Sequence, residues 1–305
     1  MNIFKNINLI PIDLTDMSSI MQAIEISNPD EVYNLAAQSF VEASFEQPIA
    51  TAEVSGIATT AFLEGIRQIK KEAKFYQASS SEMYGATGND GKPLNERSPF
   101  SPMSPYAAAK LFANWTTIIY RKAYGIFACN GILFNHESPL RGMEFVTRKI
   151  TNSVAKISLG LETKLLLGNL SARRDWGYAP EYVEAMWRML QREKPDDYVI
   201  ATGKAHSVRE FARRAFETLG LNWKRYVKTD KRFLRPLDVD CLVGDPSKAR
   251  KELNWAPRTD FAKLVTLMVQ EDAKRWKECL EGKNLPWDAP NYPSEARILT
   301  RAMKM

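Results

Sequence analysis

Residues 74–81 read KFYQASSS, a β-prone run that passes into three consecutive serines. Short apolar runs of this kind predict strands buried in a sheet. Similar runs stand on both sides of it, EVYNLAA at 31–37 and FACNGILF at 127–134. Helical patterns lie between the runs, near 50–69 and over roughly 105–124, where a proline suits the first turn. This alternation indicates an α/β fold with a parallel sheet flanked by helices.

The chain on either side continues the pattern. INLIPI (7–12) predicts a further strand, and Thr15 and Asp16 are good N-caps for a helix that reaches Ile26. Beyond residue 135 helices dominate, and we expect them near 144–160, 181–193, 207–219 and 260–281. Short strands are expected between these helices, at 164–168 and 198–202.

These patterns divide the chain into three parts. We expect a cofactor-binding α/β domain over 1–135, to which strands from 160–205 also contribute. Residues 136–285 are expected to form a smaller, mainly helical substrate-binding region, and 286–305 a loosely ordered tail. In parallel sheets of this kind the chemistry collects at the carboxyl ends of the strands.

Composition excludes several classes of function. No run approaches the roughly 18 apolar residues that span a bilayer, and the first residues make a poor secretory signal. Three widely spaced cysteines argue for a reducing compartment, so we expect a cytoplasmic protein. Only two histidines, His136 and His206, occur, so no metal site is expected. The net charge of +6 suits a small polyanion such as a nucleotide diphosphate, and no nucleic-acid or membrane partner is expected.

Tyr106 and Lys110 stand four residues apart in the predicted helix at 105–124, so their side chains share a helix face. A nearby ammonium lowers the pKa of a phenol, which lets a tyrosine exchange protons near neutral pH. The spacing alone is common and also fits a solvated helix face.

The serines that end the 74–81 run precede Glu82. Their hydroxyls can hydrogen-bond a substrate oxygen. A carboxylate two positions beyond Ser80 can exchange a proton with carbon or with a leaving hydroxyl. The alternative for this segment is a turn with serine caps and an exposed glutamate.

Other candidate segments also follow predicted strands. Asp13–Leu14 and Leu35–Ser39 leave room for a planar ligand, and Asp13 could accept from an adenine amine, although helix capping explains them equally well. His136, in the segment 135–142, favours hydrogen bonding over metal binding because it lacks a second ligand at metal spacing. Arginines beside aromatics near Arg174 and over 232–238 suit a diphosphate, or ordinary surface packing.

One expected motif is missing. A dinucleotide-binding sheet usually opens with a strand, a glycine-rich turn and a helix, because glycine lets backbone N–H groups reach the pyrophosphate. Gly85, Gly88 and Gly91 have a GxxGxxG spacing, but their surroundings predict a loop, so we do not assign them this role.

Taken together, several blocks resemble one family. They read YNLAAQSFVEASFEQP (33–48), FYQASSSEMYG (75–85), SPYAAAKLFANW (104–115), NGILFNHESP (130–139), LGNLSARRDWG (167–177) and GDPSKARKELNWAP (244–257). In this order they resemble the extended short-chain dehydrogenases/reductases, and within them the GDP-mannose 4,6-dehydratases. The resemblance covers about residues 7–270 and implies a Rossmann-like sheet, here N-terminally truncated, because the family's glycine-rich opening has no counterpart.

The resemblance implies a reaction. NADP oxidises C4 of GDP-mannose, with Tyr106 as base and with Lys110 holding the cofactor ribose and lowering the pKa of the tyrosine. Glu82 acts as acid and base while water is lost across C5–C6, and the hydride returns to C6 to give a 4-keto-6-deoxy sugar nucleotide. Ser80 stands where the family carries threonine and keeps its hydroxyl.

The resemblance also implies the site residues. The catalytic set is Ser80, Glu82, Tyr106 and Lys110. The residues expected at the cofactor are Asp13, Leu14, Leu35, Ala36, Ala37, Gln38, Ser39, Tyr106, Lys110, His136 and Arg141. Those expected at the substrate are Asn135, Lys149, Arg174 and Arg235.

The resemblance implies a homo-oligomer, dimer or tetramer, whose contacts the truncation would weaken. Two other functions stay open. A sugar-nucleotide 4-epimerase would use the same tyrosine and lysine without Glu82. A remnant that binds a nucleotide sugar without catalysis would explain the missing glycine-rich turn.

Overall fold

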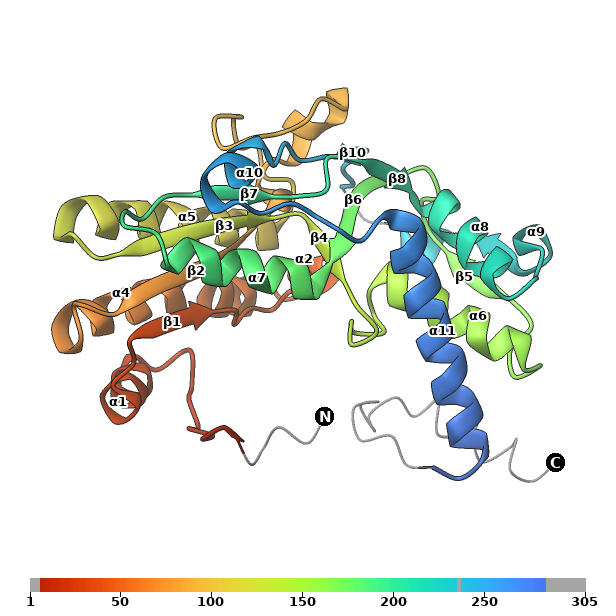
Figure 1. Cartoon of the computed structure of the whole chain (residues 1–305), viewed down its shortest axis with the longest axis horizontal. Helices are drawn as coiled ribbons and strands as arrows, with labels where there is room; N and C mark the ends of the chain where they lie inside the picture. Colours follow the sequence, from red (N-terminus) through yellow and green to blue (C-terminus); the bar gives the residue numbers. More distant parts are fainter. Residues whose placement is uncertain (1–5, 235–236, 284–305) are drawn as a thin grey trace.

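The centre of the molecule is a parallel sheet. A computed structural model describes residues 6–234 and 237–283. The strands are β1 (Glu31–Asn34), β2 (Lys74–Ser80), β3 (Ala128–Leu133) and β7 (Tyr198–Ile200), and they pair in the order β1-β2-β3-β7 (Figure 1). Every residue of β3 is buried, as expected of an inner parallel strand. The predicted α/β fold with a parallel, Rossmann-like sheet is therefore confirmed.

Helices cover both faces of this sheet. Successive side chains of a strand point to opposite faces, so Phe75 and Tyr76 enter different cores. The helices on the Phe75 side are α1 (Met17–Ser27), α4 (Ala58–Ile69) and α5 (Pro105–Tyr124). Those on the Tyr76 side are α7 (Ala179–Leu190), which lies in front of the sheet in Figure 1, and α10 (Ser247–Leu253).

Helix α5 has the bounds that its sequence predicts. The Ser104 hydroxyl accepts a hydrogen bond from the backbone N–H of Ala107 at 3.1 Å, and Pro105 occupies the first turn. The helix ends at Gly125, whose φ of +70° is a conformation that glycine adopts readily. These signals fix the start of α5, so Tyr106 and Lys110 lie within its first two turns.

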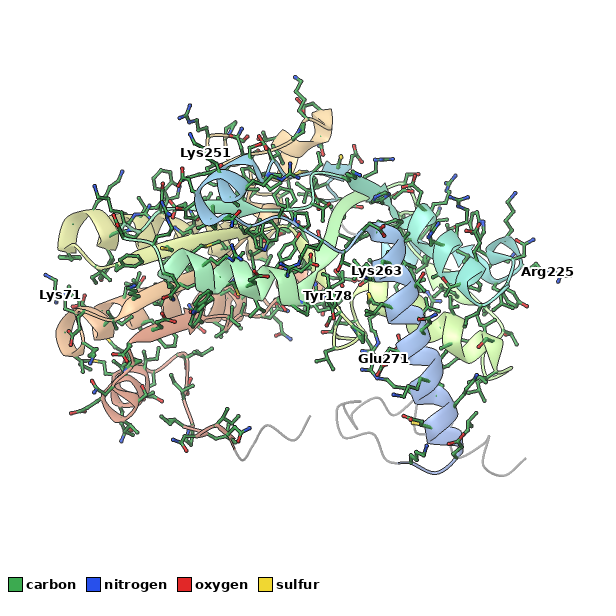
Figure 2. The ribbon with its side chains drawn as sticks, viewed as in Figure 1. Lys71, Tyr178, Arg225, Lys251, Lys263 and Glu271 are labelled. Atoms are coloured by element: carbon green, nitrogen blue, oxygen red, sulfur yellow. The ribbon has the colours of Figure 1, made fainter. Side chains whose placement is uncertain are left out.

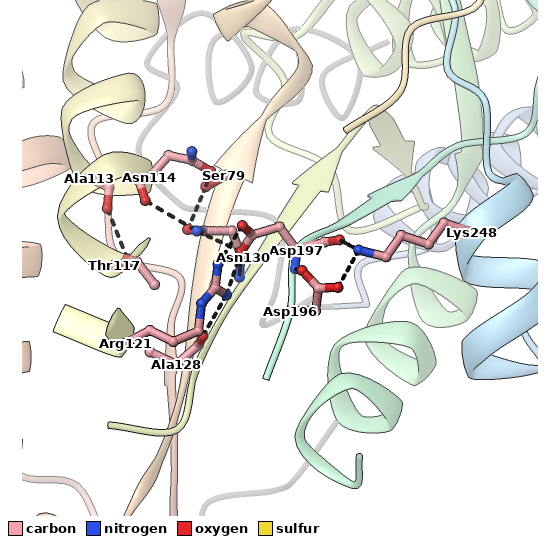
Figure 3. A network of polar contacts seen from close by, with 10 residues as sticks. All are labelled: Ser79, Ala113, Asn114, Thr117, Arg121, Ala128, Asn130, Asp196, Asp197 and Lys248. Carbon is pink, nitrogen blue, oxygen red and sulfur yellow. Dashed lines mark hydrogen bonds and ion pairs between the residues drawn. The ribbon is translucent and has the colours of Figure 1, made fainter. Parts of the chain in front are cut away.

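A buried polar network ties α5 to the sheet (Figure 3). The Ser79 hydroxyl lies 3.1 Å from Oδ1 of Asn114, and the Asn130 side chain donates to the Asn114 carbonyl at 3.2 Å. Asn130 also donates to Asp197, which pairs with Arg121 of α5 at 2.7 Å. The network therefore joins α5 to β2, β3 and the segment before β7.

The predicted helix near 50–69 exists but is interrupted. It consists of α3 (Pro48–Ala52), a π-helical turn η2 (Glu53–Ile57) and α4. Gly56 lies in this turn, where an added Cβ would stand 3.2 Å from the Ala109 carbonyl oxygen of α5. Glycine thus permits the close approach of the turn to α5.

The predicted strand at 7–12 is wrong. These residues form no regular element, and Ile7, Leu9 and Ile12 are exposed. A strand needs a hydrogen-bonded neighbour, but β1 ends the sheet and, among the described residues, pairs with β2 alone. Pro11 also lacks the N–H that a ladder requires. The next strand is shorter than the predicted 31–37, because β1 ends at Asn34.

Helices from the second half of the chain form a core separate from that of the main sheet. It is built from α6 (Val146–Ser158), α8 (Val208–Thr218) and α11 (Phe261–Leu280). Tyr178 packs against this core at its junction with the sheet (Figure 2). The helices predicted near 144–160, 181–193, 207–219 and 260–281 are all present.

Two small sheets complete the fold. In one, β6 (Arg173–Tyr178) pairs with β4 (Asn135–Glu137), β8 (Ala205–Ser207) and β10 (Cys241–Leu242). In the other, β5 (Leu165–Leu167) pairs with β9 (Val227–Thr229). Of the strands expected from 160–205, only β7 joins the main sheet, and the division into domains stays a prediction.

The remaining elements are short: α2 (Val41–Glu46), η3 (Ser81–Met83), η4 (Gly85–Asp90), α9 (Trp223–Tyr226) and η5 (Lys231–Phe233). The glycines at 85–91 lie in or directly after η4, and an added Cβ at Gly88 would stand 2.4 Å from the Cys241 carbonyl oxygen. This turn packs on β10. Within residues 6–234 and 237–283, none of the helices combines the length and apolar character needed to traverse a membrane. The expected tail at 286–305 and Arg235 lie outside the described residues.

Candidate active site

Ser80, Tyr106 and Lys110 meet where β2 ends and α5 begins. Ser80 is the last residue of β2, and its side chain hydrogen-bonds that of Tyr106. One turn along α5, the Lys110 ammonium donates to the Ala78 carbonyl oxygen at 2.9 Å and lies 5.9 Å from the centre of the Tyr106 ring. All three side chains are buried, so the alternative of a solvated helix face is excluded.

The pKa of Tyr106 shifts against the expected direction. Burial raises it to about 12, and the negative charge of Glu82 adds to the rise. The hydrogen bond with Ser80 and the positive charge of Arg141 lower it. Burial lowers the pKa of Lys110 to about 8, because desolvation disfavours its charged form. The protein therefore holds Tyr106 as a neutral phenol, and Arg141 rather than Lys110 is the cation that opposes the rise.

Glu82 belongs to the same site. Its backbone N–H donates to the Ser80 hydroxyl at 3.2 Å, and its carboxylate lies 4.0 Å from Nε of Arg174. Its side chain is only 14% exposed, which excludes the alternative of a glutamate on an open turn. The structure thus brings Ser80, Glu82, Tyr106 and Lys110 together.

A cavity of about 170 Å³ opens beside Glu82, between the sheet and the helical core. Its lining includes four further predicted residues: Asn135, Arg141, Lys149 and Arg174. Phe233 and Asp238 of the segment 232–238 also line it. Other lining residues had no predicted role, among them Phe40, Glu42, Glu137 and Phe145. They come from separate loops and helices, so no local motif could have grouped them.

Cationic groups face this cavity from fixed positions. Arg174 donates to the Val239 carbonyl oxygen at 2.7 Å and lies 3.3 Å from Asp238. The Lys149 ammonium stands 3.4 Å from the centre of the Phe233 ring, and burial lowers its pKa. Such held cations suit a diphosphate.

Arg141 is held on two sides. Its Nε lies 3.4 Å from Glu137 Oε2, and its guanidinium stacks 3.6 Å from the centre of the Phe145 ring. Phe145 in turn meets Phe40 edge to face. Burial raises the pKa of Glu137, which accepts a hydrogen bond from the Thr147 hydroxyl at 2.6 Å.

His136 lies on β4 at the edge of this site. Its ring stacks on Tyr182 with centres 5.2 Å apart, and Nδ1 lies 3.0 Å from the Phe134 carbonyl oxygen. Burial lowers its pKa to about 4, so the ring is neutral at physiological pH. A neutral ring that donates through Nδ1 presents Nε2 as an acceptor. In the part of the chain that the structure describes, no cluster of metal-ligating side chains is found.

The segments near β1 are placed differently. Asp13 accepts hydrogen bonds from the N–H and hydroxyl of Thr15, and these bonds lower its pKa. The cap of α1 is Asp16, so Asp13 stabilises the turn before the helix. These contacts are local and do not bring Asp13 or Leu14 to the tyrosine.

Leu35–Ser39 follows β1 at the carboxyl edge of the sheet. Leu35 and Ser39 are exposed, whereas Ala36, Ala37 and Gln38 are half-buried. The Gln38 backbone N–H donates to Ser55 at 3.0 Å, and its side-chain oxygen is buried without a hydrogen-bond partner.

A nicotinamide cofactor fits one half of this edge. The unpartnered amide oxygen of Gln38, the acceptor of His136 and the buried Tyr106–Lys110 pair supply the groups that a ribose and nicotinamide would meet. Among the described residues, no glycine-rich turn links a strand to a helix at this edge.

Comparisons with known proteins agree with this geometry. A family model described as GDP-mannose 4,6 dehydratase matches residues 1–268. The chain is 57% identical over 288 residues to GDP-mannose 4,6 dehydratase 2 of Arabidopsis thaliana, covering 92% of this chain and 76% of that one. It is 48% identical over 281 residues to the Homo sapiens GDP-mannose 4,6 dehydratase, covering 86% and 75%.

Solved structures show the same fold. RMD from Pseudomonas aeruginosa, complexed with NADPH, superposes with a TM-score of 0.80 at 21% identity, covering 88% of this chain and 90% of that one. Thermus thermophilus UDP-glucose 4-epimerase, complexed with NAD, gives a TM-score of 0.77 at 26% identity, covering 88% and 85%. With the family match spanning nearly the whole described chain, this protein belongs to the GDP-mannose 4,6-dehydratase family.

Proposed function

We propose that the chain converts GDP-mannose to GDP-4-keto-6-deoxymannose, with NADP as cofactor. Its family membership supports the substrate, since the Arabidopsis and human relatives carry the name of this dehydratase. The observation that carries the chemistry is Ser80, which bonds both the Tyr106 side chain and the Glu82 backbone. Ser80 thereby fixes the backbone of Glu82 beside Tyr106, and the negative charge of Glu82 acts on the Tyr106 phenol.

Tyr106 is the base for the first step. As the phenolate, the form that the positive charge of Arg141 favours, it takes the proton of the C4 hydroxyl, and Ser80 hydrogen-bonds the same sugar oxygen. When bound, a nicotinamide would supply the hydride acceptor for C4 and the hydride donor for C6. The residues that would hold it are Gln38, whose amide oxygen has no partner, His136, whose ring is an acceptor, and Lys110, one turn from Tyr106.

Glu82 carries the dehydration. It removes the proton from C5 and donates a proton to the departing C6 hydroxyl, so that water leaves and a C5–C6 double bond forms. The two protons released, from the C4 hydroxyl and from C5, balance the two consumed, one in the water and one regained at C5. Lys149 and Arg174 line the adjoining cavity, and we assign them to the diphosphate of the substrate.

The epimerase alternative depends on Glu82. An epimerase of this family needs the tyrosine and lysine but no carboxylate there. We expect Glu82→Gln to lower formation of the 4-keto-6-deoxy product by at least about 100-fold, because it removes the acid and base. The measurement is product analysis by NMR, with Glu252→Gln, a carboxylate on α10 that bonds Tyr198, as the control.

A direct assay tests the whole proposal. The chain is incubated with GDP-mannose and either NADP or NAD, while nicotinamide fluorescence and calorimetry measure the binding of each cofactor and of GDP. We expect the keto product, with NADP preferred. Binding of GDP without any binding of NADP would instead identify a non-catalytic binding protein. An epimerised hexose in place of the keto sugar would identify an epimerase.

A further inference from the structure

We propose that the buried carboxylates Glu137 and Asp272 are positioning residues that fix Arg141 beside the reacting sugar. The inference rests on the proposed function, because it takes the cavity that Arg141 and Glu82 line to be the sugar site, whereas the expected place of Arg141 was the cofactor. The fixing itself is a property of the fold. Glu137 holds the side chain of Arg141, and Asp272 holds the loop that carries it.

The side chain is fixed from within the cavity wall. Glu137 is 1% exposed and lies 3.4 Å from Nε of Arg141, while the Thr147 hydroxyl donates to the same carboxylate oxygen at 2.6 Å. The ring of Phe145 supports the guanidinium at 3.6 Å. An arginine held by a carboxylate and an aromatic face has lost most of its rotamer freedom before any ligand binds.

The backbone of the loop is fixed from the opposite side. Arg148 of α6 donates to the carbonyl oxygens of Pro139 at 2.6 Å and of Arg141 at 3.0 Å. Arg275 of α11 donates to the same Pro139 carbonyl oxygen at 2.5 Å. Two helices that are far apart in the sequence therefore hold one loop.

Asp272 makes this arrangement possible. It is 1% exposed, accepts from Nε of Arg148 at 2.8 Å and from the Thr151 hydroxyl at 2.6 Å, and lies 3.2 Å from Arg275. Two buried guanidiniums need a counter-charge, since an uncompensated buried charge is strongly unfavourable. Asp272 is the buried carboxylate that Arg148 and Arg275 share, while Arg275 also pairs with the half-buried Glu271 at 3.7 Å.

The position of Arg141 bears on the chemistry. Arg141 lines the cavity together with Glu82, and its charge lowers the pKa of Tyr106. A guanidinium displaced by even 1 Å would stabilise the reacting groups less well, and such displacements lower rates by up to about 100-fold.

The test uses Glu137→Gln and Asp272→Asn, which keep the side-chain shape but remove the charge. The matched control is Asp197→Asn, because Asp197 is a half-buried partner of an arginine and does not line the cavity. Each variant is labelled with ¹⁵N-arginine, and the Nε–H resonance of Arg141 is assigned by its loss in Arg141→Lys. This readout needs no turnover.

We expect both variants to move the Arg141 resonance to the position of a free side chain, and the control to leave it unchanged. We also expect kcat for GDP-mannose to fall about 10-fold with little change in KM, because Lys149 and Arg174 are untouched. An unchanged resonance in either variant would overturn the positioning role. A moved resonance with unchanged kcat would overturn its role in the reaction.

Two further cases are covered: a wild-type protein without turnover, and a variant that does not fold. If the wild-type protein shows no turnover of GDP-mannose, the proposed function fails and the resonance alone decides whether the carboxylates position Arg141. If Asp272→Asn does not fold, Arg275→Lys replaces it, since lysine keeps the charge but cannot reproduce the guanidinium fork. Loss of thermal stability with the resonance in place would show a merely structural cluster.

Discussion

Ser80 connects the side chain of Tyr106 to the backbone of Glu82. Its hydroxyl is hydrogen-bonded to the Tyr106 side chain and accepts from the Glu82 backbone. The spacing of Tyr106 and Lys110 predicted their shared helix face, but not the carbonyl of Ala78 that binds the lysine. That acceptor lies 32 residues away along the chain, so the environment of the tyrosine, and with it the sign of its pKa shift, depended on tertiary packing.

Tyr106→Phe tests the tyrosine as a proton acceptor. We expect turnover of GDP-mannose to fall by about 100-fold or more, because the ring stays packed while the exchangeable proton is lost. Steady-state kinetics and circular dichroism measure the two effects. The control is Tyr198→Phe, whose hydroxyl bonds Glu252 on α10. Equal activities of the Tyr106 and Tyr198 variants would remove Tyr106 from the mechanism.

Helix α5 was predictable from the sequence because its signals are local. A serine cap, a proline in the first turn and a terminal glycine lie within the helix ends themselves. Local signals could not show that the strand expected at 7–12 is absent, because a strand needs a hydrogen-bonded neighbour from another part of the chain. The interruption of the 50–69 helix has the same origin, since Gly56 meets α5.

Ser104→Ala tests the start of α5. The substitution removes the acceptor of the Ala107 N–H, so we expect the free energy of unfolding to fall by about 1 kcal/mol. Urea unfolding followed by circular dichroism measures this change. Ser104→Asp should retain most of the stability, because aspartate is also a good cap. If alanine and aspartate behave alike, the cap does not hold the helix.

The cavity is a property of the whole molecule. Its lining runs from Phe40 to Asp238 and includes residues of both the sheet region and the helical core. The family resemblance predicted four of these residues besides Glu82, since they lie in recognisable blocks. Phe40 has no local pattern that points to the site, so only the assembled fold identifies it.

His136 links the stability of the whole protein to pH. Its folded pKa of about 4 lies below the usual 6.5 of an unfolded histidine, so its neutral form is favoured in the fold. Above pH 6.5 the neutral histidine contributes its full stabilisation. As the pH falls toward 4, the free energy of unfolding decreases by roughly 3 kcal/mol at most, because the unfolded state binds the proton more tightly. We expect His136→Gln to lose less stability than wild type between pH 6.5 and 4, as measured by urea unfolding. Parallel curves for the two proteins would contradict this expectation.

The polar network of Figure 3 fixes α5, the helix that carries Tyr106 and Lys110, against the sheet. A shift of α5 along the sheet would separate Arg121 from Asp197 and break the hydrogen bond between Asn130 and Asn114. Ligand entry therefore cannot be accommodated by a shift of the tyrosine. We therefore expect a ligand that widens the cavity to displace the side chains of Lys149 and Phe233, which line it, rather than α5.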